Sequence, residues 1–170
     1  MTSALEMGAA GRGSCPSEAV KSAFSRLPSG VCVVTAKAGG ALAGMTMTSI
    51  TPLTLSPPRL ALCFGDGSGT FAVIRSGARF AVNVLTSDQR ETASTFAGTG
   101  REKFEDAELA EVEGCPVLAH AHAVFLCTLE NHMRVGDHTI VVALVQVALG
   151  GNGEPLLRHN RRYGTFLAGR

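Results

Sequence analysis

Hydroxyl side chains are concentrated in the segment from Gly44 to Pro58, whose sequence is GMTMTSITPLTLSPP. The flanking segments, Gly30 to Ala36 and Arg59 to Phe64, are rich in the small and β-branched apolar residues of buried strands. A buried hydroxyl without a hydrogen-bond partner costs about 1–3 kcal/mol. These hydroxyls therefore either bond to neighbouring backbone or line a cavity that receives a polar ligand; they belong to Thr46, Thr48, Ser49 and Thr51.

A second group of polar residues lies in GDGSGT, Gly65 to Thr70, between a predicted strand and a predicted helix. The backbone N–H groups of such a loop and the hydroxyls of Ser68 and Thr70 converge at the start of the helix, which favours phosphate binding. The alternative is an ordinary loop in which Thr70 only caps the helix.

Asn83 places a carboxamide inside the predicted strand FAVNVL, on the same face as Ala81 and Leu85. A polar group in a buried strand needs hydrogen-bond partners. Asn83 is therefore either a satisfied core residue or a ligand contact, and the sequence leaves both readings open.

The tripeptide Gly136-Asp137-His138 precedes a long apolar strand, where a histidine would stand at a barrel rim and could contact substrate. Its alternative is a hairpin turn, because Gly and Asp are common turn residues. Lys103 and Phe104 follow a Gly-Thr-Gly loop, and Lys103 is either a counter-charge for a phosphate or a solvated lysine.

The chain carries no recognised pattern for metal binding or nucleophilic catalysis. His120 and His122 alternate along a predicted strand, but no nearby Cys or carboxylate completes a ligand set, so we expect no metal. Neither a GxSxG elbow nor a Walker or Rossmann fingerprint occurs, so a nucleotide would be held by other means.

The composition suits one domain that forms a homodimer and does not bind nucleic acid. Of the 170 residues, 45% are hydrophobic and 17% are charged, which leaves surface for a second copy to cover. The net charge is +1, Trp is absent, and no Lys/Arg cluster is interleaved with aromatic residues.

The cysteines and the apolar runs predict a cytoplasmic protein. The five cysteines share no CxxC spacing and resemble core hydrophobes of a reducing compartment. The longest apolar run, Ile140 to Leu149, is about half the length of a membrane span, so no membrane is expected. Residues 1–16 lack the pattern of a signal peptide, and their Gly and Ala content predicts a disordered leader.

The periodicity of residues 17–170 predicts strands with few helices. A first helix runs from Ser17, as N-cap, to about Leu27, and others cover residues 71–76 and 87–97, the last with Thr86 and Gln89 at capping-box spacing. Many strands with Gly-rich turns favour a closed or nearly closed antiparallel barrel. The predicted strands cover residues 31–36, 42–51, 60–64, 80–85, 121–132, 139–149 and 155–157.

Taken together, these segments resemble the short-chain flavin reductase family, the reductase components that supply reduced flavin to two-component monooxygenases. The resemblance runs from about Phe24 to Phe166. It rests on LPSGVCVVTA, GMTMTSITPLTLSPPRLALCF, SGARFAVNVL, KF, GCPVL, GDHTIVVALV and PLLRHNRRYG in this order.

The resemblance implies a mainly β fold, a split β-barrel of the FMN-binding type with peripheral helices, as a homodimer with flavin at the subunit interface. It implies an NAD(P)H:flavin oxidoreductase in which NADH or NADPH reduces FMN or FAD for a partner monooxygenase. Two alternatives stay open: an FMN-dependent oxidase of the pyridoxamine-phosphate oxidase type, and a non-catalytic flavin-binding module.

The resemblance also implies roles for individual residues. Thr46, Thr48 and Ser49 would bond the polar edge of the isoalloxazine ring, and Asn83 would face the flavin. Ser68 and Thr70 would lie near the ribityl phosphate with Lys103 as its counter-charge. His138 would be the catalytic-site residue that positions the nicotinamide dinucleotide. The other positions implied to contact the cofactor are Met47, Cys63, Phe104 and Tyr163.

Two positions depart from the family pattern. Arg158 stands where an aromatic residue is common, and Thr48 stands where Asn or Ser is frequent. Arg162 and Tyr163 match a tail segment that closes over the nucleotide in the family, and Arg161 and Arg162 are candidates for reading a 2′-phosphate.

Overall fold

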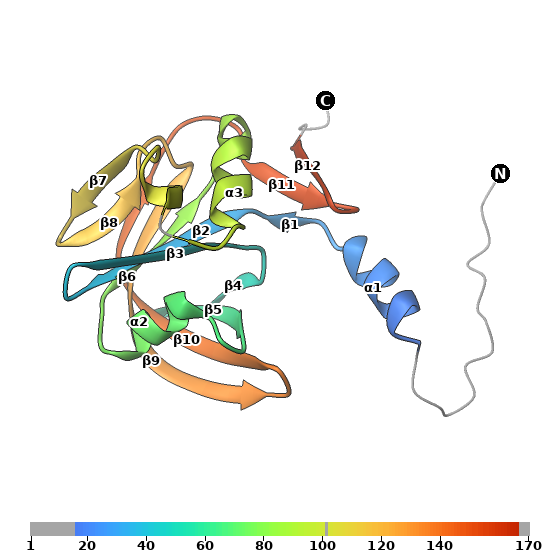
Figure 1. Ribbon diagram of the computed structural model, residues 1–170, viewed down its shortest axis with the longest axis horizontal. Coiled ribbons are helices and arrows are strands. Elements are labelled where there is room, and N and C mark those ends of the chain that lie inside the picture. Colours follow the sequence, from blue (N-terminus) through green and yellow to red (C-terminus); the bar gives the residue numbers. More distant parts are fainter. Residues whose placement is uncertain (1–15, 101, 167–170) are drawn as a thin grey trace.

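The protein is a β-rich domain with three short α-helices, seen in a computed structural model that describes residues 16–100 and 102–166 (Figure 1). The helices are α1 (Ser17–Ser25), α2 (Gly69–Arg75) and α3 (Arg90–Phe96). The strands are β1 (Ser29–Gly30), β2 (Cys32–Ala38), β3 (Ala41–Met47), β4 (Ile50–Leu55), β5 (Pro58–Gly65), β6 (Phe80–Val84), β7 (Leu109–Val112), β8 (Cys115–Leu118), β9 (Ala123–Val135), β10 (His138–Gly150), β11 (Leu156–His159) and β12 (Arg162–Thr165).

The central sheet is antiparallel and has seven strands in the order β3-β2-β6-β9-β10-β5-β4. Its two edges, β3 and β4, follow each other in the chain and are joined by Thr48 and Ser49. The sheet therefore curves back on itself without a continuous ladder across this seam. This arrangement confirms the mainly β, split-barrel prediction.

Strand alternation explains how the sheet buries side chains on both faces. Val34 on β2 belongs to the inner core with Phe64 and Phe80, whereas its neighbour Val33 belongs to an outer cluster that includes Phe96 of α3. All of these side chains are almost completely buried, because helix α3 and the sheet β1-β11-β12 cover part of the outer face. Residues adjacent in sequence thus serve different cores.

The chain departs from the predicted elements at several places. The strand predicted over residues 42–51 breaks at Thr48, between β3 and β4. The N-cap of α1 is Pro16 and not Ser17, which is the first helical residue. The capping box of Thr86 and Gln89 is confirmed, although it opens a 3₁₀ turn that leads into α3. Four strands were not predicted: β1, β7, β8 and β12.

None of the described helices is long and apolar enough to cross a lipid bilayer. The predicted leader lies, apart from Pro16, outside the described residues.

Candidate functional site

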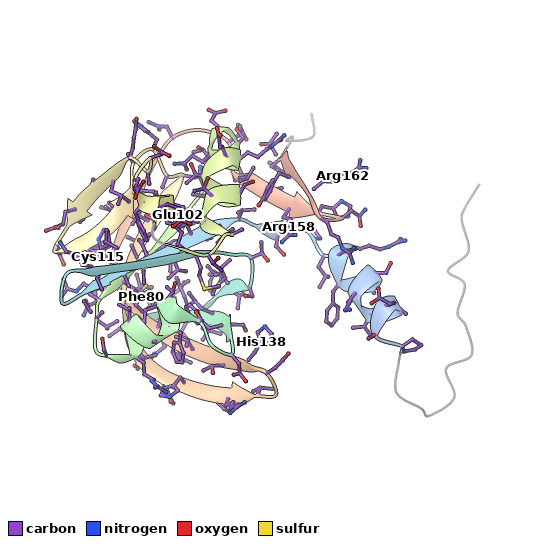
Figure 2. The ribbon with its side chains drawn as sticks, in the orientation of Figure 1. Phe80, Glu102, Cys115, His138, Arg158 and Arg162 are labelled. Atoms are coloured by element: carbon purple, nitrogen blue, oxygen red, sulfur yellow. The ribbon has the colours of Figure 1, made fainter. Side chains whose placement is uncertain are left out.

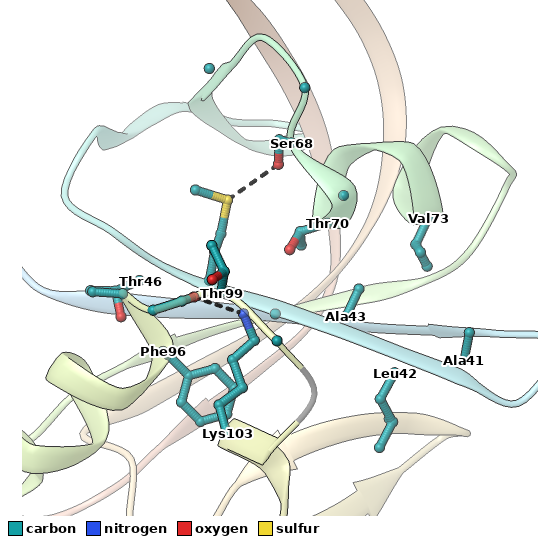
Figure 3. Close-up of a pocket in the computed structure, with 18 of the residues that line it drawn as sticks. Ala41, Leu42, Ala43, Thr46, Ser68, Thr70, Val73, Phe96, Thr99 and Lys103 are labelled. Carbon is teal, nitrogen blue, oxygen red and sulfur yellow. Dashed lines mark hydrogen bonds between the residues drawn. The ribbon is translucent and has the colours of Figure 1, made fainter.

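A cavity of about 650 Å³ runs along the outer edge of β3 (Figure 3). One wall is the loop from Gly65 to Gly69 with the first residues of α2, and the other is the end of α3 with the loop that leads to Lys103. The volume lies within the range of about 300–1,000 Å³ found for small-ligand sites. The cavity therefore has room for a cofactor-sized molecule.

The floor of the cavity is an unpaired sheet edge. In the described sheet β3 pairs with β2 alone, so its other edge offers backbone N–H and C=O groups to a ligand. Ala41, Ala43 and Gly44 are small and keep this edge accessible. Alternation turns Met45 to the inner core and Thr46 to α3, so the cavity follows the line where the two faces of β3 meet.

The wall at α2 carries two hydroxyls that point toward the cavity. Ser68 caps the helix by accepting a hydrogen bond from the Phe71 N–H at 3.2 Å, and its hydroxyl lies 3.4 Å from the sulfur of Met45. The side chain of Thr70 is 5% exposed, and no other described residue hydrogen-bonds its hydroxyl, which faces the cavity in Figure 3. Thr70 is therefore available to a ligand.

The opposite wall carries the cation Lys103. Its Nζ donates to the Gly98 carbonyl at 3.2 Å, which holds the ammonium over the cavity (Figure 3). Partial burial lowers the pKa of Lys103 below its usual value, while the carboxylate of Glu102 acts in the opposite direction.

An aromatic pair supports the same wall from behind. Phe96 lines the cavity and meets Phe104 edge to face, with ring centroids 5.1 Å apart. Both rings press on Gly44, where a Cβ atom would stand 3.0 Å from each of them. Gly44 is thus required by the close approach of β3 to the aromatic pair. Phe104 lies one layer behind the cavity surface and supports Phe96.

The hydroxyl-rich segment divides between backbone contacts and cavity lining. The Thr46 hydroxyl donates to the Ala93 carbonyl at 2.6 Å, and the Ser49 hydroxyl donates to the Cys63 carbonyl at 3.1 Å. Each hydroxyl has then used its hydrogen and keeps only acceptor lone pairs. Thr46 lines the cavity, so it can accept a hydrogen bond from a ligand N–H. Thr48 lines a different cavity.

His138 does not line this cavity, but it begins β10 next to a residue that does (Figure 2). It pairs with Gly65 of β5, and its Nε2 lies 3.8 Å from the position of a Cβ built on that glycine. The Nδ1 atom is 2.8 Å from the carboxylate of Asp137, and this hydrogen bond lowers the pKa of Asp137. His138 is half exposed and its ring lies beside the lining residue Gly65, outside the cavity itself.

Asn83 does not reach this cavity, and the expectation that it faces a ligand is not met. Its side chain is completely buried, its Nδ2 donates to the Val33 carbonyl at 2.9 Å and to the Thr35 hydroxyl at 3.1 Å, and its Oδ1 accepts from the Leu118 N–H at 2.9 Å. The amide joins β2, β6 and β8. It is the satisfied core residue that the sequence offered as the alternative.

Three other candidate residues also lie away from the cavity. Met47 is 4% exposed and packs in the inner core. Cys63 pairs with Ile140 in the sheet and is partly buried. Tyr163 packs on the outer cluster beside β11. The cavity therefore gathers four of the predicted residues: Thr46, Ser68, Thr70 and Lys103.

The sequence did not reveal several lining residues. Val73 on α2 and Phe96 on α3 line the cavity, but their spacing looks like that of ordinary core-facing helix positions. The Gly98-Thr99-Gly100 loop also lines the cavity. Its small and polar residues were the one feature of the sequence that could have indicated a ligand-binding loop.

Comparison with known proteins finds one family over most of the chain. The sequence profile of the flavin reductase like domain matches residues 24–167. The reductase component of 4-nitrophenol 4-monooxygenase/4-nitrocatechol 2-monooxygenase from Rhodococcus opacus is 37% identical, over 82% of this chain and 75% of the relative. A flavin reductase (NADPH) from Lentzea aerocolonigenes is 37% identical over 84% of this chain and 86% of the relative.

Solved structures agree with this comparison. An NADH:FAD oxidoreductase from Streptomyces globisporus, in complex with NAD and FAD fragments, superposes with a TM-score of 0.82 at 30% identity, covering 87% of this chain and 91% of that one. A flavin reductase structure from Haemophilus somnus gives a TM-score of 0.85 at 26% identity, covering 89% of this chain and 100% of that one.

Proposed function

The chain belongs to the flavin reductase-like family, and on this basis we propose that it is an NAD(P)H:flavin oxidoreductase that reduces FMN or FAD for a partner monooxygenase. The observation that carries the proposal is the convergence of Thr46, Ser68, Thr70 and Lys103 on one cavity. These residues come from three separate segments, namely β3, the start of α2 and the loop after α3, and the family resemblance assigns all of them to flavin.

The chemistry of the lining residues fits a flavin mononucleotide unit. Lys103 supplies a positive charge for the phosphate, and the hydroxyls of Ser68 and Thr70 lie on the wall across the cavity from it. The unpaired edge of β3 and the acceptor lone pairs of Thr46 suit a planar ring that carries N–H and C=O groups along one side. Phe96, Val73 and Ala43 give the ring an apolar surface.

Hydride acceptance from the nicotinamide is the chemistry that the bound flavin supplies, so the protein needs no general base. The residues bind and orient the two partners. Backbone N–H groups along β3 would face the ring edge and would stabilise negative charge there. Lys103, Ser68 and Thr70 would hold the phosphate and thereby orient the ring in the cavity.

His138 is proposed to position the hydride donor. Its ring lies beside Gly65 of the cavity wall, and its Nδ1 is hydrogen-bonded to the carboxylate of Asp137. A donor entering from this side would meet Nε2 before it reaches the flavin. His138 therefore acts on the nicotinamide dinucleotide and not on the flavin phosphate.

We further propose that the protein is a cytoplasmic homodimer. Leu55 is 89% exposed and Met133 is 61% exposed, on β4 and β9 respectively, which supports coverage by a second copy. Cys32, Cys63, Cys115 and Cys127 are free thiols, as is usual in a reducing compartment. Light scattering should give a mass twice that of the 17.6 kDa chain.

The test of the function is a steady-state assay of NADH and NADPH against FMN, FAD and riboflavin, followed at the absorbance of the reduced nicotinamide. We expect flavin-dependent oxidation of at least one donor, with oxygen returning the flavin to its oxidised form. Absence of turnover with every pair, under conditions where the protein binds flavin, would leave only a flavin-binding module.

A further inference from the structure

The cavity beside β3 has a carboxylate on the wall that is assigned to the flavin phosphate. Asp66 lines this wall together with Ser68 and Thr70, and Lys103 lies on the opposite wall (Figure 3). Among the described residues that line the cavity, Asp66 is the one acidic residue and Lys103 is the one basic residue. Their charges cancel, so these lining residues alone give a phosphate little net attraction.

A second carboxylate near Lys103 makes this charge problem larger. Burial lowers the pKa of Lys103, and the carboxylate of Glu102 acts in the opposite direction because it lies close to the ammonium. Glu102 therefore offsets part of the positive potential that Lys103 supplies. A phosphate would be attracted to the cavity only if the charge of Asp66 is neutralised from outside.

Arg134 provides this neutralisation. It lies near the end of β9 and does not line the cavity, but its Nη2 donates to Oδ2 of Asp66 at 2.7 Å. Its Nε donates to the Gly136 carbonyl at 3.2 Å, which holds the guanidinium over the β9–β10 turn. Arg134 therefore acts on the cavity through Asp66 and not by contact with a ligand.

The surrounding contacts direct Arg134 to Asp66 alone. The Asp66 N–H donates to the Asp137 carbonyl at 2.9 Å, which fixes the loop against the turn. The carboxylate of Asp137 is hydrogen-bonded to His138 at 2.8 Å and makes no described contact with Arg134. Among the described ion pairs, Asp66 has Arg134 as its one partner.

The exposure of the pair indicates that its role is not to stabilise the fold. The side chain of Arg134 is 71% exposed and that of Asp66 is 47% exposed, and ion pairs this accessible to solvent contribute little to stability. We infer that Arg134 is a specificity-determining residue, which neutralises Asp66 and thereby lets the cavity prefer a phosphorylated flavin to riboflavin. This inference rests on the proposed function, because that function places a flavin in the cavity.

The experiment compares the wild type with Arg134→Gln, Asp66→Asn and the double variant that carries both substitutions. The matched control is Arg79→Gln, which breaks an ion pair of similar length, 2.6 Å to Glu113, between residues that do not line the cavity. Unfolding temperatures establish that each variant folds. Fluorescence titrations with FMN and with riboflavin, at low and at high ionic strength, measure the preference for the phosphate.

We expect Arg134→Gln to bind FMN about fivefold more weakly and riboflavin as the wild type does, since an unpaired charge on the wall of a solvated cavity repels a phosphate by about that factor. The double variant should recover FMN affinity to within about twofold of the wild type, because it has lost the carboxylate as well. Asp66→Asn should bind FMN at least as tightly as the wild type, and Arg79→Gln should be unchanged. High salt should reduce the difference between Arg134→Gln and the wild type.

The inference is overturned if Arg134→Gln leaves FMN affinity unchanged, or if it weakens FMN and riboflavin equally. It is also overturned if the double variant binds FMN as weakly as Arg134→Gln, because Arg134 would then act by holding the turn against the loop and not through its charge. In each case turnover of flavin with NADH or NADPH would continue, so the proposed function would stand. Conversely, a preference for FMN that follows these charges without any turnover would retain the inference and remove the function.

Discussion

At the scale of single residues, Lys103 has the most specific proposed role, because its positive charge is assigned to the phosphate of the flavin. Lys103→Ala should weaken FMN binding about tenfold and leave riboflavin, which has no phosphate, unchanged. Titration of flavin fluorescence measures both affinities. Equal losses for FMN and riboflavin would show that the substitution disturbs the cavity and does not remove a counter-charge.

The same residue predicts a pH dependence. Burial lowers the pKa of Lys103, so its charge is present at neutral pH and is lost on the alkaline side earlier than for a solvated lysine. FMN affinity relative to riboflavin should therefore fall as the pH rises through this lowered pKa. Lys103→Arg should retain the affinity to higher pH, because a guanidinium stays protonated. An identical alkaline limit in both proteins would contradict the assignment.

His138 is assigned to the hydride donor, so its removal should separate the two substrates. His138→Ala should raise the KM for NADH several-fold and change the affinity for FMN by less than about twofold, since the ring does not line the cavity. Asp137→Asn, which keeps the ring but alters its hydrogen-bond partner, should raise KM less. An unchanged KM in His138→Ala would remove the residue from the donor site.

Substitution of Asn83 should lower the stability of the fold and leave flavin affinity unchanged, the opposite of what we expect for the residues that line the cavity. Asn83→Ala leaves the Val33 carbonyl and the Leu118 N–H without partners in the core, and should lower the free energy of unfolding by about 2–4 kcal/mol. Flavin affinity, measured where the variant is folded, should match the wild type. Urea denaturation and FMN titration together check this. Full stability with lost flavin binding would return Asn83 to the ligand site.

At the scale of elements, the close contact between β3 and the aromatic pair sets the width of the cavity. Gly44→Ala puts a methyl group 3.0 Å from both Phe96 and Phe104 and 3.1 Å from the Val34 carbonyl, so β3 or the rings must move. Overpacking of this kind costs about 1–3 kcal/mol. Both FMN and riboflavin should bind more weakly, because Phe96 is part of the wall.

A control for this prediction is Gly30→Ala, where no atom lies within 4 Å of the added Cβ. That variant should keep the stability and flavin affinity of the wild type within about 0.5 kcal/mol. Equal behaviour of Gly44→Ala and Gly30→Ala, judged by thermal unfolding and FMN titration, would show that the contact does not determine the cavity.

The elements also show which parts of the fold the sequence could predict. Strands such as β6 and β10 follow from runs of apolar and β-branched residues, whose burial does not depend on distant partners. The short strands β7 and β8 lack such runs, so they were missed. Leu118 of β8 supplies a partner of Asn83, and without β8 the amide could not be recognised as satisfied.

The candidate site could also be predicted only in part, because its residues come from segments that are distant in the sequence. Loop composition suggested Ser68 and Thr70, but spacing alone could not place Lys103 across from them, because the cavity is closed by α3 and the loop after it. The family resemblance supplied that grouping. The hydrogen bonds that Thr46 and Ser49 donate to backbone carbonyls are contacts with residues distant in the sequence. Only the folded chain shows that these hydroxyls have used their hydrogens and keep acceptor lone pairs alone.

At the scale of the whole molecule, the split sheet and the ligand cavity have one origin. Because the barrel is not closed between β3 and β4, β3 keeps a free edge, and helices α2 and α3 flank that edge. A closed barrel would have used the same backbone groups in a ladder. The proposed function therefore requires a flavin that lies along β3.

Flavin binding to Ala43→Trp tests this claim most directly. The substitution places an indole in the cavity on the β3 edge, and Ala72→Trp, on an exposed position of α2 outside the lining, is its matched control. With unfolding temperatures close to that of the wild type, Ala72→Trp should bind FMN and riboflavin normally, and Ala43→Trp should bind neither. Wild-type affinity of folded Ala43→Trp for both flavins would contradict the account.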